Sequence, residues 1–249
     1  MNYYDNDDNN NNNYGSQVAQ PVNTGDITLA KTFMSGVFTW MFVALGITGF
    51  MAYVLSTNVQ FLQMMFNGNG LSPIGWVIMF APLGLALLMS FGFAKLSPMA
   101  MTIIFVIYAG LMGMSLSFIF LVYTANSIFL TFAVTAGTFG VMAIAGWVTK
   151  MDLTKFGSIL MMALVGVIIA MVVNYFAKSE QLSYIISIAG VLIFTGLTAY
   201  DVQKLKRIGS GQAPGADDTR KLTIMGALTL YLDFINLFLF LLRILGSRR

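Results

Sequence analysis

Residues 222–242 read LTIMGALTLYLDFINLFLFLL, an apolar run that contains a single charged residue, Asp233. At about 1.5 Å per residue, a helix of this length crosses a hydrocarbon core of about 30 Å. Its Leu, Ile and Phe side chains favour insertion by roughly 4–8 kcal/mol in total, which outweighs the cost of about 3 kcal/mol for one carboxylate at mid-span. The run is therefore predicted to be a transmembrane helix that carries a buried carboxylate.

Six apolar stretches of similar length precede this run, at about 33–55, 73–93, 99–123, 127–148, 157–176 and 182–201. The chain is 57% hydrophobic and 9% charged, with a mean hydropathy of +0.79, whereas a soluble domain is about 25% charged. We expect an all-α integral membrane protein in which residues 30–249 form one domain of seven transmembrane helices. Residues 1–29, rich in Asn and Asp and poor in aliphatic side chains, are predicted to be a disordered tail.

The distribution of Lys and Arg predicts the orientation in the membrane. Nine of the 13 basic residues fall before the first span or in the 2–3, 4–5 and 6–7 loops, and four fall on the opposite side. The positive-inside rule then places the N-terminus in the cytoplasm and, with seven spans, the C-terminus outside a cell (inner) membrane. The basic C-terminal residues argue the other way, and a re-entrant last segment would put both termini in the cytoplasm. In the 6–7 loop, Lys204, Lys206 and Arg207 are expected to anchor the sixth helix to anionic lipid.

The chain has no Cys and no His, which excludes disulfides, thiol nucleophiles, His-based catalytic triads and the usual zinc sites. Neither enzymatic activity nor a cofactor nor a nucleic-acid partner is expected. The expected surroundings are the lipid bilayer, and the expected ligands are ions.

A second carboxylate, Asp201, stands at the end of the sixth apolar stretch, one span before Asp233. For Asp201 alone, an equally good interpretation is the first polar residue after a span. Thr198 and Asn236 each lie three residues from one of these aspartates, on the same helix face, and are predicted to be supporting polar groups. The first six spans place no Lys or Arg beside the two aspartates.

Two neighbouring carboxylates without a cation cannot both ionise cheaply, so such a pair shares a proton and can exchange it for a cation. Calcium prefers about 6–8 oxygen ligands, of which two carboxylates supply at most about four. Asn236, Thr198, backbone carbonyls and water would complete the shell. The sequence thus predicts a proton and calcium site at Asp201 and Asp233.

The two carboxylates can form a pair only if they lie at a similar depth in the membrane. In a simple hairpin the two carboxylates would differ in depth by roughly 12 Å. We predict that the linker 209–216 lets the last helix extend farther into the cytoplasm and so brings the pair level. Carboxyl groups more than about 10 Å apart in every state would contradict the pair, because the two could then not share a proton.

The residues around the two aspartates resemble the bacterial branch of the Bax inhibitor-1 family. The resemblance is carried by TAYDVQ at 198–203, LTLYLDFINLF at 228–238 and LLR at 241–243, supported by residues 113–117 and 146–154. It covers roughly residues 30–249 and implies a seven-helix bundle with the seventh helix central. It also implies a pH-sensitive calcium leak channel gated by a di-aspartyl unit, here Asp201 and Asp233. Some relatives carry a basic residue in the second span that contacts this unit, whereas residues 73–93 of this chain have no charge.

Two other functions compete with the calcium leak. An intramembrane aspartyl protease also uses two aspartates on neighbouring helices, but its second motif is G-x-G-D, where this chain has Leu230-Tyr231-Leu232-Asp233. A non-conducting regulator that binds another membrane protein, such as a protease or a channel, stays open as the alternative function.

Overall fold

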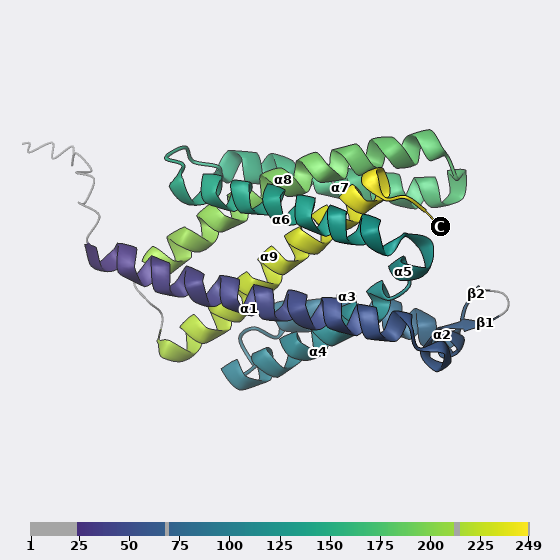
Figure 1. The fold of residues 1–249 in the computed structure, drawn as a ribbon. Coiled ribbons are helices and arrows are strands. Elements are labelled where there is room, and N and C mark those ends of the chain that lie inside the picture. Colours follow the sequence, from purple (N-terminus) through teal and green to yellow (C-terminus); the bar gives the residue numbers. More distant parts are fainter. Residues whose placement is uncertain (1–23, 68–69, 212–214, 249) are drawn as a thin grey trace, which may run out of the picture.

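The computed structural model describes residues 24–67, 70–211 and 215–248. Seven of its helices are long and apolar enough to cross a membrane, and they form one elongated bundle (Figure 1). The elements are α1 (Thr24–Ser56), α2 (Val59–Met65), β1 (Phe66–Asn67), β2 (Gly70–Leu71), α3 (Pro73–Phe91), α4 (Pro98–Leu116), α5 (Ile119–Val122), α6 (Ala125–Val148), α7 (Thr154–Ala177), α8 (Glu180–Ser210) and α9 (Ala216–Leu245). The predicted all-α membrane fold of seven spans is confirmed.

The helix boundaries differ from the predicted spans where polar residues continue a helix beyond its apolar core. Helix α1 begins at Thr24, so the last residues of the predicted tail 1–29 are helical, while residues 1–23 lie outside the described part of the chain. Helix α8 continues through its basic end to Ser210. Helix α9 is one continuous 30-residue helix, which excludes the re-entrant alternative for the last segment.

Two features of the loops were not predicted. The connection after α1 contains α2 and a two-stranded antiparallel hairpin, in which Phe66 pairs with Leu71. The third span is divided near Ser117 into α4 and α5. Ser97 caps the start of α4 by accepting a hydrogen bond from the Ala100 amide at 3.2 Å, as its place before Pro98 predicts.

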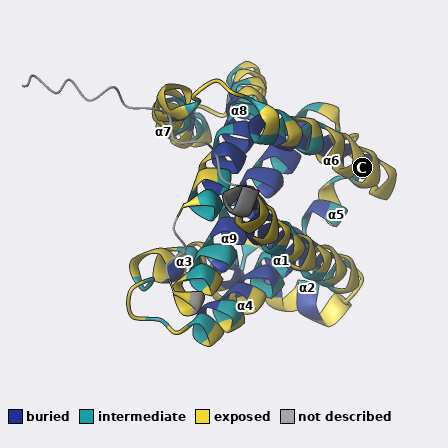
Figure 2. Ribbon diagram, turned by 90° about the vertical axis from the view of Figure 1, so that its left-hand side faces the viewer, coloured by how far each residue is buried: buried dark blue, intermediate teal, exposed yellow. Residues whose placement is uncertain are grey.

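Helix α9 lies in the middle of the bundle, as predicted. It packs against α1, α3, α4, α6 and α8, and 67% of its apolar window is buried, compared with 11–44% for the other spans. Figure 2 shows buried residues around α9, with α7 and α3 at the edge of the molecule. Helix α7 packs against α8.

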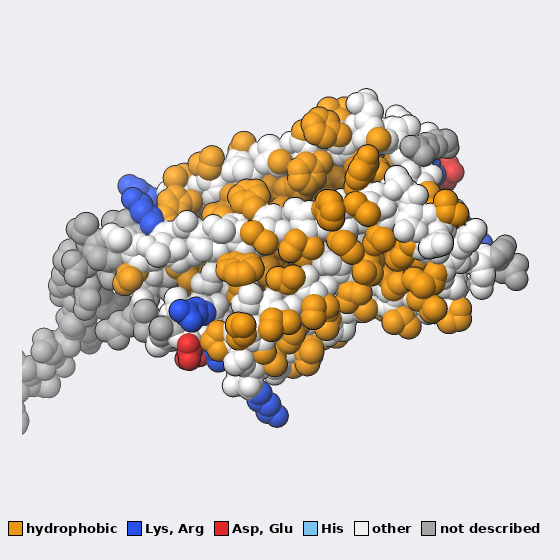
Figure 3. All heavy atoms as spheres, turned by 60° about the horizontal axis from the view of Figure 1, so that its bottom comes forward, with side chains coloured by type: hydrophobic (Ala, Val, Ile, Leu, Met, Phe, Trp, Pro, Cys, Tyr) orange, Lys and Arg blue, Asp and Glu red, His pale blue; other side chains and the backbone are white. Residues whose placement is uncertain are grey.

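The outer surface is apolar over the length of the spans (Figure 3). Large side chains such as Phe91, Phe129 and Phe176 are 73–84% exposed, which in water would be a costly and aggregation-prone surface. Lys, Arg, Asp and Glu side chains gather at the two ends in this view. This distribution fits a bundle whose middle faces lipid tails.

A buried hydrogen-bond chain fixes the rotation of α9 within the bundle. The Tyr231 hydroxyl and Thr48 Oγ1 lie 2.7 Å apart, and Thr48 Oγ1 donates to the Ala109 carbonyl at 2.9 Å. The chain thus joins α9, α1 and α4, and the Tyr231 side chain is fully buried. Because residues two apart point to opposite sides of a helix, this attachment turns Asp233 away from α1 and α4.

Candidate functional site: a buried carboxyl pair between α8 and α9

Glycines on two neighbouring helices position the segment of α8 that carries Asp201. A Cβ at Gly146 of α6 would collide with the Ala199 backbone, and a Cβ at Gly157 of α7 would collide with the Tyr200 ring. Both helices therefore approach α8 at the turn immediately before Asp201, as small residues permit between membrane helices. Asp201 is 9% exposed and lies inside the helix. Asp201 is therefore a buried helical residue and not the start of a loop.

The structure brings the two predicted aspartates together. Asp233 of α9 is 5% exposed, and its carboxyl group lies close enough to that of Asp201 for the two to interact directly, in the lining of one cavity. The two carboxyl groups therefore meet the depth condition, with α9 crossing the bundle diagonally between its neighbours (Figure 1). Residues 212–214 of the linker lie outside the described residues. Since a carboxylate only accepts hydrogen bonds, a hydrogen bond between the two groups would require one proton on the pair.

A cavity of about 520 Å³ adjoins the pair. It lies between α7, α8 and α9, and both aspartates, Asn236 and Lys204 line it. Asp233 Oδ2 is buried and has no hydrogen-bond partner among the described residues. The site therefore presents one unsatisfied carboxyl oxygen next to a space large enough for water or a ligand.

The comparisons with known proteins identify the family. The family model described as "Inhibitor of apoptosis-promoting Bax1" matches residues 30–249. The chain belongs to the Bax inhibitor-1 family. It is 47% identical to the inner membrane protein YbhL of Escherichia coli strain K12, over 88% of this chain and 93% of YbhL. It is also 44% identical to the protein RP147 of Rickettsia prowazekii, over 88% of this chain and 91% of that protein.

In this member of the Bax inhibitor-1 family, the two supporting polar residues bond to their own helices. Thr198 Oγ1 donates to the Phe194 carbonyl at 2.8 Å, and Asn236 Nδ2 donates to the Leu232 carbonyl at 2.8 Å. The Asn236 side-chain nitrogen therefore bonds to Leu232 and not, as predicted, to Asp233. Asn236 lines the cavity with Asp233, so its amide belongs to the surroundings of the pair.

A cation that the sequence did not assign to the site lies beside Asp201. Lys204 lines the same cavity, its charge acts on Asp201, and its ammonium lies 6.0 Å from the centre of the Tyr200 ring. No Lys or Arg lies within the first six predicted spans, and Lys204 comes to the pair because α8 continues past its apolar core. The i,i+3 spacing of Asp201 and Lys204 on one helix is the signal that could have revealed it.

The loop between α6 and α7 is fastened to α8 two residues after Asp201. Gln203 Oε1 accepts a hydrogen bond from the Leu153 amide at 2.9 Å, and Gln203 Nε2 donates to the Met151 carbonyl at 2.7 Å. Arg207 donates to the same Gln203 oxygen at 2.9 Å. The segment that begins α7 is thereby tied to the helix that carries Asp201.

Two of the three predicted lipid anchors contact protein groups in this loop instead. Arg207 forms an ion pair with Asp152 at 2.7 Å, and Lys206 Nζ donates to the Trp147 carbonyl at 2.6 Å while lying 5.0 Å from the Trp147 ring centre. Hydrogen bonds from Thr154 and then from Arg207 hold the pKa of the exposed Asp152 carboxyl below its usual value. These contacts form because the 4–5 loop folds back within reach of Lys206 and Arg207, and the anchoring of these side chains to lipid stays a prediction.

The pair has few further ligands for a metal ion. Among the described residues, no three His, Cys, Asp or Glu side chains gather into a group that could hold a metal. Calcium bound at Asp201 and Asp233 would need most of its oxygens from water, Asn236 and backbone carbonyls. Such a site suits transient occupancy better than storage.

Proposed function

We propose that this protein is a pH-sensitive calcium leak channel of the inner membrane, in which Asp201 and Asp233 form the gate. The observation that carries the proposal is that two buried carboxyl groups on neighbouring membrane helices lie together in the lining of one cavity. A carboxylate in the middle of a bilayer is expensive and is therefore a functional candidate by default. Membership of the Bax inhibitor-1 family supports the same role.

The chemistry of the gate is an exchange between one proton and one cation. With the proton in place, the two carboxyl groups bond to each other and hold α8 and α9 together. Calcium binds only ionised carboxylates, so its binding displaces the proton, and its affinity for the pair rises with pH. Lys204 competes for the same negative charge and replaces, in this chain, the basic residue that some relatives carry in the second span.

The orientation in the membrane also belongs to the proposal. The basic end of α8 and the start of α9 face the cytoplasm with the N-terminus, and the C-terminus lies outside, in keeping with the positive-inside rule. In this orientation the exposed Lys204 places the polar end of the cavity in the cytoplasmic half of the bundle.

Calcium flux into proteoliposomes across a range of pH tests this function. The parent protein should conduct calcium in a pH-dependent manner, and Asp201→Asn and Asp233→Asn should each abolish that pH dependence. Variants that conduct like the parent at every pH would show that the gate lies elsewhere. A purified parent that conducts no calcium would favour a regulator that binds another membrane protein.

A further inference from the structure

The cavity beside the carboxyl pair is long and runs parallel to the helices. Its lining on α8 extends from Phe194 to Lys204 and its lining on α7 from Met161 to Met171, each about 15 Å at 1.5 Å per residue. Its volume of about 520 Å³ falls within the range of about 300–1,000 Å³ typical of small-molecule sites. The cavity has the dimensions of a short chain molecule.

Its two ends differ in chemistry. One end holds the carboxyl pair and Lys204, and the other is apolar, where the rings of Phe194 and Phe240 stack with their centres 5.9 Å apart. Phe194 and Phe240 each lie seven residues from the aspartate on their own helix, which is about 10 Å along the axis. A ligand that fits both ends is therefore an amphiphile.

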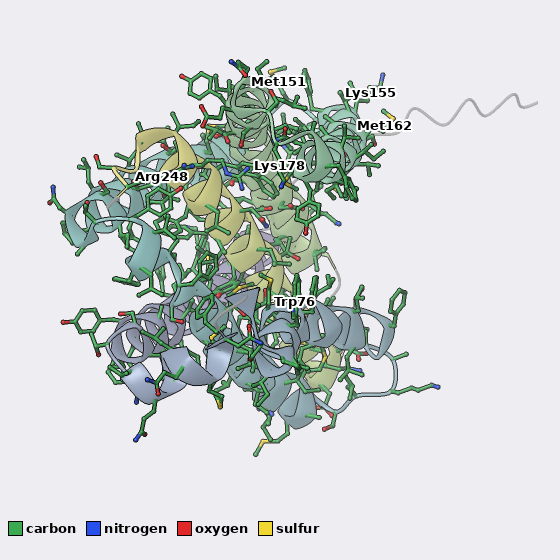
Figure 4. All side chains as sticks on the ribbon, turned by 90° about the vertical axis from the view of Figure 1, so that its right-hand side faces the viewer. Trp76, Met151, Lys155, Met162, Lys178 and Arg248 are labelled. Carbon is green, nitrogen blue, oxygen red and sulfur yellow. The ribbon has the colours of Figure 1, made fainter. Side chains whose placement is uncertain are left out.

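The α7 wall of the cavity is open to the lipid side of the bundle. Met161 and Ile168 line the cavity and are nevertheless 53% and 46% exposed. The adjacent Met162 points away from the bundle (Figure 4). A molecule dissolved in the bilayer can thus approach the pair from the side, between α7 and α9.

The polar end of the cavity best matches a ligand group that donates hydrogen bonds and carries positive charge. Asp233 lines the cavity, and its buried Oδ2 has no hydrogen-bond partner among the described residues. Two carboxyl groups there face one fixed cation, Lys204. A primary ammonium group offers three donors and no acceptor, and a charge-assisted bond to a carboxylate is roughly twice as strong as a neutral one.

We propose that this cavity binds a membrane-soluble primary alkylammonium amphiphile. Its ammonium group contacts Asp233 and Asp201, and its chain lies between α7 and the stacked rings of Phe194 and Phe240. The proposal rests on the proposed function in that it uses the same carboxyl pair, and such a ligand would compete there with calcium. Binding itself requires no ion flux.

Photolabelling of the full chain in lipid nanodiscs, without calcium, tests this site. The probe is an alkylamine with a diazirine in its chain, and mass spectrometry locates the adducts. Labelling of cavity-lining residues on α7 and α8, normalised to the lipid-facing Ile144 of α6, which is 65% exposed, should exceed that of an alcohol probe of equal length. Dodecylamine should compete with the probe, whereas dodecanol and dodecanoate should not. Equal competition by all three would overturn charge recognition, and adducts no denser in the cavity than at Ile144 would overturn the site.

Substitutions that remove a single charge test whether the cavity recognises the ammonium group, because each should raise or lower cavity labelling in a predictable direction. Asp233→Asn should reduce cavity labelling about tenfold, or about 1.4 kcal/mol, close to the value of one hydrogen bond to a charged group. Lys204→Gln removes the competing cation and should increase labelling, while Asp152→Asn, an exposed carboxylate outside the cavity, should leave it unchanged. Leu164→Trp fills the cavity without altering the carboxyl groups and should abolish labelling, which keeps the test decisive if Asp233→Asn does not fold. Labelling with these signs in a protein that conducts no calcium would refute the channel and leave the ligand site standing.

Discussion

Thr48→Val tests the buried hydrogen-bond chain that sets the rotation of α9. The substitution replaces the Thr48 hydroxyl by a methyl group and leaves the buried Tyr231 hydroxyl and the Ala109 carbonyl without this partner. An unsatisfied buried group costs about 1–3 kcal/mol. Interhelical hydrogen bonds in membranes average about 0.6 kcal/mol and reach about 1.7 kcal/mol, so we expect a loss of about 1–2 kcal/mol for Thr48→Val.

Combining Thr48→Val with Tyr231→Phe separates the energy of the Thr48–Tyr231 hydrogen bond from the effects of altered packing. Tyr231→Phe should cost less than Thr48→Val, because the Thr48 hydroxyl keeps its bond to Ala109. Once Tyr231 is Phe, Thr48→Val should cost about 1 kcal/mol less than it does in the parent, since no hydroxyl is then left unpaired.

Equilibrium unfolding of the purified protein in mixed micelles with dodecyl sulfate measures all four free energies. Thr39→Val serves as the matched control, because its hydroxyl bonds to Ser35 within α1 and is exposed. Additive effects of Thr48→Val and Tyr231→Phe, within about 0.3–0.5 kcal/mol, would refute the reasoning.

Three further predictions concern the helices around Asp201. Gln203→Leu removes three hydrogen bonds to the α6–α7 loop and its neighbour, so amide hydrogen exchange at 151–153 should become faster while exchange in the middle of α9 stays unchanged. Gly146→Leu should destabilise the protein by more than about 3 kcal/mol, because even its Cβ would collide with the Ala199 backbone, whereas a Cβ at Gly140 on the same helix would meet nothing within 4 Å, so Gly140→Leu should be tolerated in the same micelle unfolding assay. Asp152 has a pKa below its ordinary value of 3.8, so its ion pair with Arg207 is complete above that pH and is lost only as the pH falls further. Calcium flux through Asp152→Asn should therefore keep the pH dependence of the parent at neutral and mildly acidic pH, and loss of that dependence would assign the pH sensor to the loop.

The spans and the central position of α9 could be anticipated from the sequence, for different reasons. The spans follow from hydrophobic length, which has one solution in a bilayer. The central position of α9 came from the family resemblance, and the structure accounts for it by its burial on all sides. The hairpin at Phe66–Leu71 escaped prediction because two-residue strands leave no periodic pattern.

The two aspartates of the site could be predicted from the sequence, whereas most of the hydrogen bonds around them could not. Asp201 and Asp233 stand out because carboxylates are costly in an apolar run. The partners of Thr198 and Asn236 were missed because a side chain in a membrane helix can bond to the carbonyl four residues earlier instead of to its neighbour. The contacts of Lys206 and Arg207 depend on where the 4–5 loop folds, which is a tertiary feature with no local signal.

Proton release on calcium binding tests the central claim most directly. Calcium is added to the purified protein in weakly buffered detergent solution near neutral pH, and the released protons are counted with a pH indicator. If Asp201 and Asp233 share a proton that calcium displaces, the parent should release up to about one proton per chain, and Asp233→Asn should release none. Calcium binding by the parent without proton release, or equal release from Asp233→Asn, would contradict the proton and calcium gate.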